Sequence, residues 1–279
     1  MLTDSEIREI VFEMGDEVLT PTSHMFPEYG AISILESSKR SAPGFTKLVK
    51  ARPAIQLIEV ILAANRNYNK VVRPHIERIT KETDLTSFDQ LTAKIQGISQ
   101  EEFYNFWGHR DEKKYTILKE ILDRIPKLRK KYPVAVNDYD LMHHWANDVD
   151  LNNYRRDIIG EIKFVAIATI QHLRMSYGCD TVKPDQRVKE VLQRRLNYPK
   201  LSDLKVIEAV EHISKVTGLS TLVIDQIFVN YGSGYFNISE NRNSITDIAR
   251  NLKRLGVAEE IIIEATKLPK SVVESLSAK

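Results

Sequence analysis

The sequence contains a single cysteine, Cys179, among its 279 residues. One thiol excludes an internal disulfide framework and any iron–sulfur or metal site held by four cysteines, and it fits a reducing compartment. A long hydrophobic run is also missing. The nearest candidate, residues 162–175, is too short to span a bilayer and is interrupted by Gln171, His172 and Arg174. Residues 1–10 do not resemble a signal peptide. We therefore expect a cytoplasmic protein that does not enter a membrane.

The sequence has no large excess of either acidic or basic residues. The 40 basic and 38 acidic residues leave a net charge of +2, so any contact with nucleic acid must come from a local basic patch rather than a global field. The histidine pair His143–His144 and His172 lack the partner spacing of a known metal site. We expect neither a metal nor a cofactor.

Segments with the alternating pattern of strands are few, whereas helical periodicity recurs through the chain. Ser87 and Ser99 are predicted N-caps, and Ser99 with Glu102 matches a capping box. Residues 20–43 are expected to be irregular, and Pro126 should end or kink the helix that precedes it. The predicted fold class is all-α, and the predicted helices span residues 5–14, 54–66, 71–80, 113–125, 138–147, 204–218 and 220–231.

The central stretch is Tyr154–Leu196. It begins with a polar turn around Gly160, followed by the apolar run 162–175, which predicts a helix that is buried on nearly all sides. Gly178 should end this helix, because glycine adopts the left-handed conformation of helix C-caps. Asp185 then precedes a basic amphipathic helix. An acid at the start of a basic helix suggests a carboxylate that acts on a polyanion.

These residues resemble the helix-hairpin-helix DNA glycosylase superfamily. Residues 158–166 match the family's hairpin pattern without a gap, with Gly160 on the first hairpin glycine and Ala166 on the alanine. Residues 183–188 match the segment that carries the catalytic aspartate, and the resemblance places Asp185 there. Residues 57–66, 108–118 and 224–235 match further family segments in order, so the resemblance covers roughly two thirds of the chain.

The hairpin departs from the family pattern at three positions. The second hairpin glycine is replaced by Ile162, and Glu161 lies inside the loop that offers backbone N–H groups to a DNA phosphate. Phe164 occupies the position of the lyase lysine of bifunctional members. Lys163 lies one residue earlier, about 100° round a helix. The resemblance therefore implies a monofunctional enzyme, unless the hairpin is shifted by one residue and Lys163 is a Schiff-base nucleophile.

The chemistry implied is hydrolysis of the N-glycosidic bond of a damaged or mismatched base that is flipped out of double-stranded DNA. Positive charge develops on the deoxyribose, and Asp185 would stabilise it and orient the attacking water. The alternative is a purely structural role for Asp185, as the N-cap of the helix that follows. Asn65 would reach into the duplex. The remaining candidates are DNA contacts at Gly160, Ile162, Lys163, Arg187 and Lys189, and base-pocket residues Tyr68, Trp107 and Phe164, with Tyr104 and Trp145 as other available aromatics.

Two alternatives remain open beside the glycosylase, which is expected to act as a monomer. The altered hairpin also fits a helix-hairpin-helix module that binds DNA or a protein without catalysis, and Lys163 leaves a glycosylase/lyase possible. Alkylated, deaminated and oxidised bases all remain possible substrates. The expected domains are residues 1–238, which form a two-lobed glycosylase-like body, and residues 239–279, a small helical segment expected to dock on it.

Overall fold

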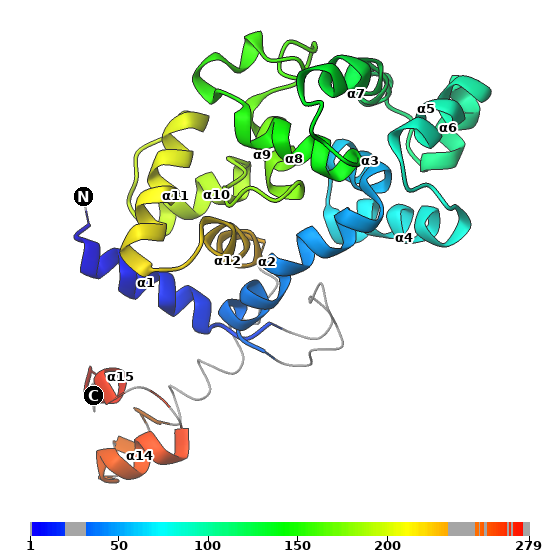
Figure 1. Cartoon of the computed structure of the whole chain (residues 1–279). Coiled ribbons are helices and arrows are strands. Elements are labelled where there is room, and N and C mark those ends of the chain that lie inside the picture. Colours follow the sequence, from blue (N-terminus) through cyan, green and yellow to red (C-terminus); the bar gives the residue numbers. More distant parts are fainter. Residues whose placement is uncertain are drawn as a thin grey trace. The chain divides into compact units, whose positions relative to one another are not determined.

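The computed structural model describes residues 2–19, 32–233, 249–250, 252–253, 256–266, 268 and 270–275. All named elements in these residues are helices (Figure 1), which confirms the all-α prediction; a single isolated bridge pairs Val18 with Ser33. The chain divides into two compact units. Unit 1 comprises residues 1–16 and 34–233, and unit 2 comprises residues 17–33 and 234–279. The predicted domain boundary at residue 238 lies outside the described residues.

The helices of unit 1 pack in two groups. One group contains α1 (Asp4–Asp16), α2 (Ile34–Ala51), α10 (Gln186–Arg195), α11 (Asp203–Thr217) and α12 (Thr221–Gly232). The other contains α3 (Pro53–Ala63), the π-helix η2 (Tyr68–Val72), α4 (Arg73–Glu82), α5 (Phe88–Gly97), α6 (Gln100–Trp107), α7 (Glu112–Lys131), α8 (Asp138–Asp148), the 3₁₀-helix η3 (Leu151–Arg156) and α9 (Ile167–Ser176). Contacts of α2 with α3 and α9, and of α11 with α9, join the groups.

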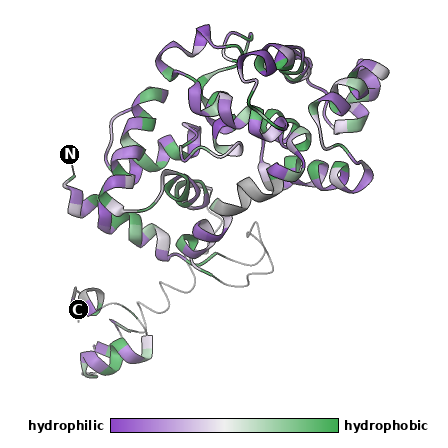
Figure 2. Ribbon diagram, viewed as in Figure 1, coloured by the Kyte–Doolittle hydropathy of each residue, from purple (hydrophilic) through white to green (hydrophobic). Residues whose placement is uncertain are grey.

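Helix α3 is the most completely buried element of the second group. Its sequence, PAIQLIEVILA, is apolar on almost every face, and Glu59 is its only residue that is not buried. Such a helix must be covered on all sides, and α4, α7 and α9 pack against it. In the first group α12 is also largely buried, and Figure 2 shows its hydrophobic residues among the other helices of unit 1.

Local sequence signals explain several helix boundaries. Ser87 and Ser99 both form complete capping boxes, with Gln90 and Glu102, as predicted for Ser99. The prediction of an irregular segment at 20–43 is wrong for residues 34–43, which belong to α2. Helix α7 continues through Pro126 to Lys131, so Pro126 does not end it.

The start of the central helix was also predicted wrongly. Helix α9 begins at Ile167 rather than at residue 162, because Phe164 adopts a left-handed backbone conformation with φ of 70°. A non-glycine residue in this conformation cannot continue a right-handed helix. Residues 157–166 form successive turns instead, and they leave Phe164 on the surface.

Unit 2 has a small core of its own. Ala249, Ile262 and Val273 are fully buried against one another, and α14 (Glu259–Thr266) packs on α15 (Lys270–Ser275). Lys253 links two segments of the unit, because its Nζ donates hydrogen bonds to the carbonyl oxygens of Val273 at 2.8 Å and Glu274 at 3.0 Å. The predicted docking of this segment on the body stays a prediction.

Candidate active site

Asp185 is the N-cap of α10. Its Oδ1 accepts hydrogen bonds from the backbone N–H groups of Arg187 at 2.9 Å and Val188 at 3.2 Å. Its Oδ2 is 4.0 Å from Nζ of Lys183, and the Asp185 side chain is 28% exposed. One carboxylate oxygen is therefore fixed by the helix N-terminus, as expected for an N-cap, while the other lies 4.0 Å from the Lys183 ammonium group.

The segment that carries Asp185 is held by buried amides and acids. Gln171 of α9 donates through Nε2 to Thr181 Oγ1 at 2.7 Å and to the Val182 carbonyl at 3.0 Å. On the other side, the backbone N–H of Lys183 donates to Oδ1 of Asp225, on α12, at 3.0 Å. Residues 181–185 are thus fixed between two helices, which orients both Lys183 and Asp185.

Asp225 is a second carboxyl group of this site. It is 2% exposed, and its Oδ2 accepts a hydrogen bond from Gln226 Nε2 at 3.0 Å. Burial, together with the negative charge of Asp185, raises the pKa of Asp225 to about 7. Two carboxyl groups close to each other resist simultaneous ionisation, so the protonation of Asp225 is set partly by Asp185.

Lys183 lies among other basic groups. Burial, together with the charges of Arg66 and Lys183, lowers the pKa of Lys114 to about 8. Burial also lowers the pKa of His172, again with a contribution from Lys183. The positive charge of Lys183 thus acts on both α7 and α9, and a neutral His172 is the stable form.

Lys114 connects α7 to the loop that follows α3. Its Nζ donates to the carbonyl oxygens of Leu62 at 2.7 Å and Ala64 at 2.6 Å. These are C-terminal carbonyl groups of a buried helix, which need a donor. The next residue, Asn65, is exposed and has a left-handed backbone with φ of 56°. Lys114 therefore fixes the loop from which Asn65 projects.

The predicted pocket aromatics lie in different surroundings. Tyr68 opens η2, and its hydroxyl donates to Glu59 Oε1 at 2.6 Å; burial raises the pKa of both groups. Trp107 and Trp145 are fully buried, and Tyr104 is 8% exposed. We assign Trp107 to the core rather than to a base pocket, because its ring packs against Phe103 at a centroid distance of 5.1 Å.

The hairpin is held from inside by Asp157. Its Oδ1 accepts from the backbone N–H groups of Ile159 at 2.8 Å and Gly160 at 3.1 Å, and from Trp145 Nε1 at 2.9 Å. Gly160 allows this turn, since a Cβ there would lie 1.9 Å from the Tyr154 carbonyl oxygen. Its N–H is therefore occupied and not directed at a phosphate.

Other predicted hairpin contacts are also placed differently. Ile162 is 1% exposed and belongs to the core, so its side chain is not a DNA contact. Glu161 faces α7, with Oε1 at 3.5 Å from Arg124 Nε and 3.8 Å from Lys127 Nζ. These cations offset the charge that Glu161 brings to the loop.

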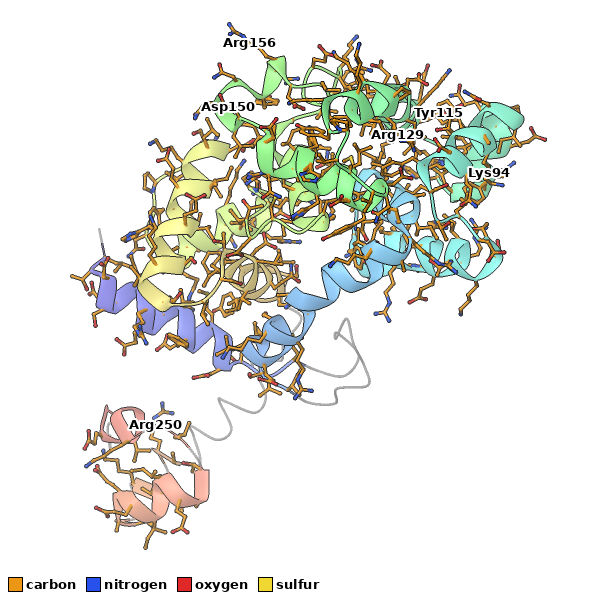
Figure 3. The ribbon with its side chains drawn as sticks, in the orientation of Figure 1. Lys94, Tyr115, Arg129, Asp150, Arg156 and Arg250 are labelled. Atoms are coloured by element: carbon orange, nitrogen blue, oxygen red, sulfur yellow. The ribbon has the colours of Figure 1, made fainter. Side chains whose placement is uncertain are left out.

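Phe164 lies on the surface of the hairpin and not in a pocket. Its side chain is 48% exposed, and two ammonium groups lie over its ring, Lys113 Nζ at 5.2 Å and Lys163 Nζ at 5.0 Å from the centroid. Arg155 and Arg156 of η3 are exposed nearby in the sequence, and Figure 3 shows Arg156 pointing outward. An aromatic ring between cations is a surface suited to nucleic acid.

Three basic residues of α10 are paired within the chain. Lys189 Nζ is 2.5 Å from Asp203, Arg187 is 3.4 Å from Glu190, and Arg195 is 3.6 Å from Glu13. The predicted DNA contacts Arg187 and Lys189 therefore have acidic partners. Asp203 belongs to α11, and the sequence pattern of α10 alone could not have indicated it.

The sequence predicted site roles for Asp185, Asn65 and Tyr68, and these stay predictions. It did not single out Lys183, Lys114, Asp225 or Glu59. A signal existed for two of them. Lys183 is two residues before Asp185, and Asp225 belongs to the 224–235 family match. Lys114 and Glu59 lie in helical patterns in which a single charge on an apolar face is the only clue.

The part of the chain that the structure describes shows neither a metal-binding cluster nor a membrane-spanning helix. Within it, no group of three or more His, Cys, Asp or Glu side chains is arranged to hold a metal ion. None of its helices is long and apolar enough to cross a membrane.

Comparison with protein-family models, curated proteins and solved structures finds no match to this chain.

Proposed function

We propose that this protein is a DNA N-glycosylase that releases a damaged or mismatched base from double-stranded DNA. The observation that carries the proposal is the setting of Asp185. Its Oδ1 is fixed by two N–H groups of α10, and Oδ2 belongs to a side chain that is 28% exposed. A carboxylate held in this way needs no reorganisation to stabilise developing positive charge.

Three other features support this proposal. The two helix groups of unit 1 agree with a two-lobed glycosylase-like body. Asn65 projects from a fixed loop at the end of α3, where a side chain that fills the gap of a flipped base is expected. The exposed Phe164 and its two lysines supply a surface for the duplex.

In the proposed reaction, the base leaves with the electron pair of the N-glycosidic bond. Asp185 stabilises the oxocarbenium-like deoxyribose through Oδ2 and accepts a proton from the attacking water. Asp225 is a positioning residue, because it binds the backbone N–H of Lys183. The exposed Lys163 lies over the Phe164 ring, so we assign it to phosphate contact rather than to the chemistry.

The test is a panel of duplexes, each with one alkylated, deaminated or oxidised base, incubated with the protein. Free base is measured by chromatography and mass spectrometry, which does not depend on strand cleavage. Release from at least one duplex by the wild type, and none by Asp185→Asn, supports the proposal and identifies the substrate. No release from any duplex that the protein binds would contradict it.

The second candidate function is a non-catalytic DNA-binding module. The observation that favours it is the internal use of the hairpin N–H groups of Ile159 and Gly160 by Asp157. Equal binding to intact and damaged duplexes, with no base release from the panel, would favour this module over the enzyme.

A further inference from the structure

His172 is a half-buried histidine of α9 that takes no part in the proposed reaction. Among the described residues neither of its ring nitrogens has a hydrogen-bond partner, and neither nitrogen is fully shielded from solvent. The adjacent Gln171 binds Thr181 and Val182, so His172 lies on the helix that holds the segment of Asp185. A shielded polar group without a partner is destabilising, and a ligand that supplies the missing hydrogen bonds would remove this cost.

Lys183 connects His172 to the candidate site. Burial and the charge of Lys183 lower the pKa of His172 well below the ordinary histidine value, and Lys183 Nζ lies 4.0 Å from Asp185 Oδ2. His172 is therefore a neutral ring near the ammonium group that also approaches the candidate carboxylate. A neutral imidazole donates one hydrogen bond and accepts one, and the edge of a nucleobase offers both kinds of partner.

Positive charge predominates around this ring. Among the described residues Lys183 is the one charged group that acts on His172. Lys183 also acts on Lys114, which is 7% exposed and is affected by Arg66 as well. The nearby acid Asp111 lies 4.0 Å from Arg66, so it offsets charge there rather than at His172.

We propose that His172 contacts the flipped base, and that the site is specific for an uncharged damaged base rather than a cationic alkylated purine. Deaminated and oxidised bases belong to the uncharged class. The inference rests on the proposed glycosylase function and names the substrate class of the same site.

The charge of the departing base distinguishes the two classes. When the N-glycosidic bond breaks, its electron pair stays on the base. An uncharged base therefore leaves as an anion, which the Lys183 ammonium group and an N–H of His172 stabilise, and it then takes a proton from water. A cationic purine leaves as a neutral molecule and gains nothing from this charge, whereas its own positive charge is repelled by Lys183 before the bond breaks.

The first test compares lesions in one sequence context, with the full chain under single-turnover conditions at mildly acidic pH. Hypoxanthine, uracil and 8-oxoguanine represent the uncharged class, and 7-methylguanine and 3-methyladenine represent the cationic class. Each released base is measured by mass spectrometry and its rate is divided by that of spontaneous loss. We expect the rate enhancement for at least one uncharged base to exceed that for either cationic base by about 10-fold or more.

The second test replaces His172. His172→Leu removes both hydrogen bonds and should slow release of the uncharged base by about 10-fold or more, with unchanged affinity for an intact duplex. His172→Gln keeps a donor and an acceptor and should recover part of this loss. The matched control is His144→Leu on α8, where Nε2 lies 3.8 Å from Asp140 Oδ2; it should keep the wild-type rate. Circular dichroism and urea unfolding check that each variant is folded.

The outcomes separate this inference from the proposed function. A larger rate enhancement for a cationic base, or equal enhancements for the two classes, would overturn the specificity. A wild-type rate in folded His172→Leu, or equal losses in the Leu and Gln variants, would overturn the contact with the base. In each of these cases, release that depends on Asp185 leaves the proposed function standing, whereas no release from any duplex overturns both.

Discussion

Asp180 and Asp185 each accept hydrogen bonds from two backbone N–H groups at the start of a helix. Asp180 binds the N–H groups of Thr221 at 3.3 Å and Leu222 at 2.8 Å, one through each oxygen. Asp185 uses Oδ1 alone for both of its bonds. Among the described residues its second oxygen has no backbone hydrogen-bond partner, which distinguishes it from the carboxylate of Asp180.

Asp225 makes folding depend on pH. Its pKa rises from 3.8 to about 7 in the folded protein. Between these values the folded state holds a proton that the unfolded state has lost, so stability falls as pH rises through this window and levels off above about 7. At about 1.4 kcal/mol per pKa unit, the cost above pH 7 is about 4 kcal/mol.

Asp225→Asn removes this cost. We expect the free energy of unfolding of the variant to exceed that of the wild type by a margin that grows from pH 4 to 7 and is constant above it. Urea unfolding at several pH values measures this margin. A margin that is independent of pH would show that the pKa of Asp225 does not change on folding and would contradict the assignment.

Gly160 lies where a side chain cannot fit. Because the added Cβ would lie 1.9 Å from a backbone oxygen, the hairpin must move, and we expect Gly160→Ala to lower the free energy of unfolding by about 3 kcal/mol. Gly97 is the matched control, since nothing lies within 4 Å of its added Cβ. Gly97→Ala should change stability by less than about 1 kcal/mol. Similar losses for both would contradict the tight turn.

At the scale of elements, helical periodicity and capping chemistry predicted most helices, because those signals are local. Ser99 with Glu102 is one case, and α8 begins and ends within a residue of its predicted bounds. The hairpin was misjudged because the residues from Ile162 through Phe164 to Ile170 are almost all apolar, with Lys163 and Thr169 as the exceptions. Hydrophobicity does not report a left-handed backbone, so the start of α9 could not be read from the pattern.

The candidate site was predictable only where its residues lie in one segment. Asp185 follows from a short motif, whereas Lys114 and Asp225 reach the site from α7 and α12. Their roles depend on packing between residues far apart in the chain. A single sequence contains no record of these distances.

Substitution of Phe164 should change the stability of the fold and its affinity for DNA in opposite directions. The left-handed conformation of a non-glycine residue costs about 1 kcal/mol, so Phe164→Gly should stabilise the fold by about this amount. The variant loses the stacking ring, and its affinity for a duplex should fall by about 1 kcal/mol or more. Phe164→Ala is the control, because it loses the ring but keeps the strained backbone. Fluorescence anisotropy and urea unfolding test both effects; unchanged affinity in both variants would contradict a role in DNA binding.

At the scale of the whole molecule, two units carry separate cores. The candidate site uses residues of unit 1 alone, from Glu59 to Asp225. Unit 2 buries Ala249, Ile262 and Val273 among themselves. A chain that folds in this way should tolerate loss of its C-terminal helices.

Deletion of residues 239–279 should therefore leave unit 1 folded, with its Tm changed by less than about 2 °C and base release retained. Differential scanning calorimetry and the base-release assay measure both. Loss of the main unfolding transition would show that unit 2 is needed for the fold of unit 1.

The central claim is that Asp185 performs base release. Its most direct test is the single-turnover rate of base release by the wild type, Asp185→Asn and Asp180→Asn, the last being a helix-capping aspartate outside the site. We predict that Asp180→Asn keeps the wild-type rate, whereas Asp185→Asn is slower by about 100-fold or more with unchanged duplex binding. Equal rates for the two variants would contradict the account.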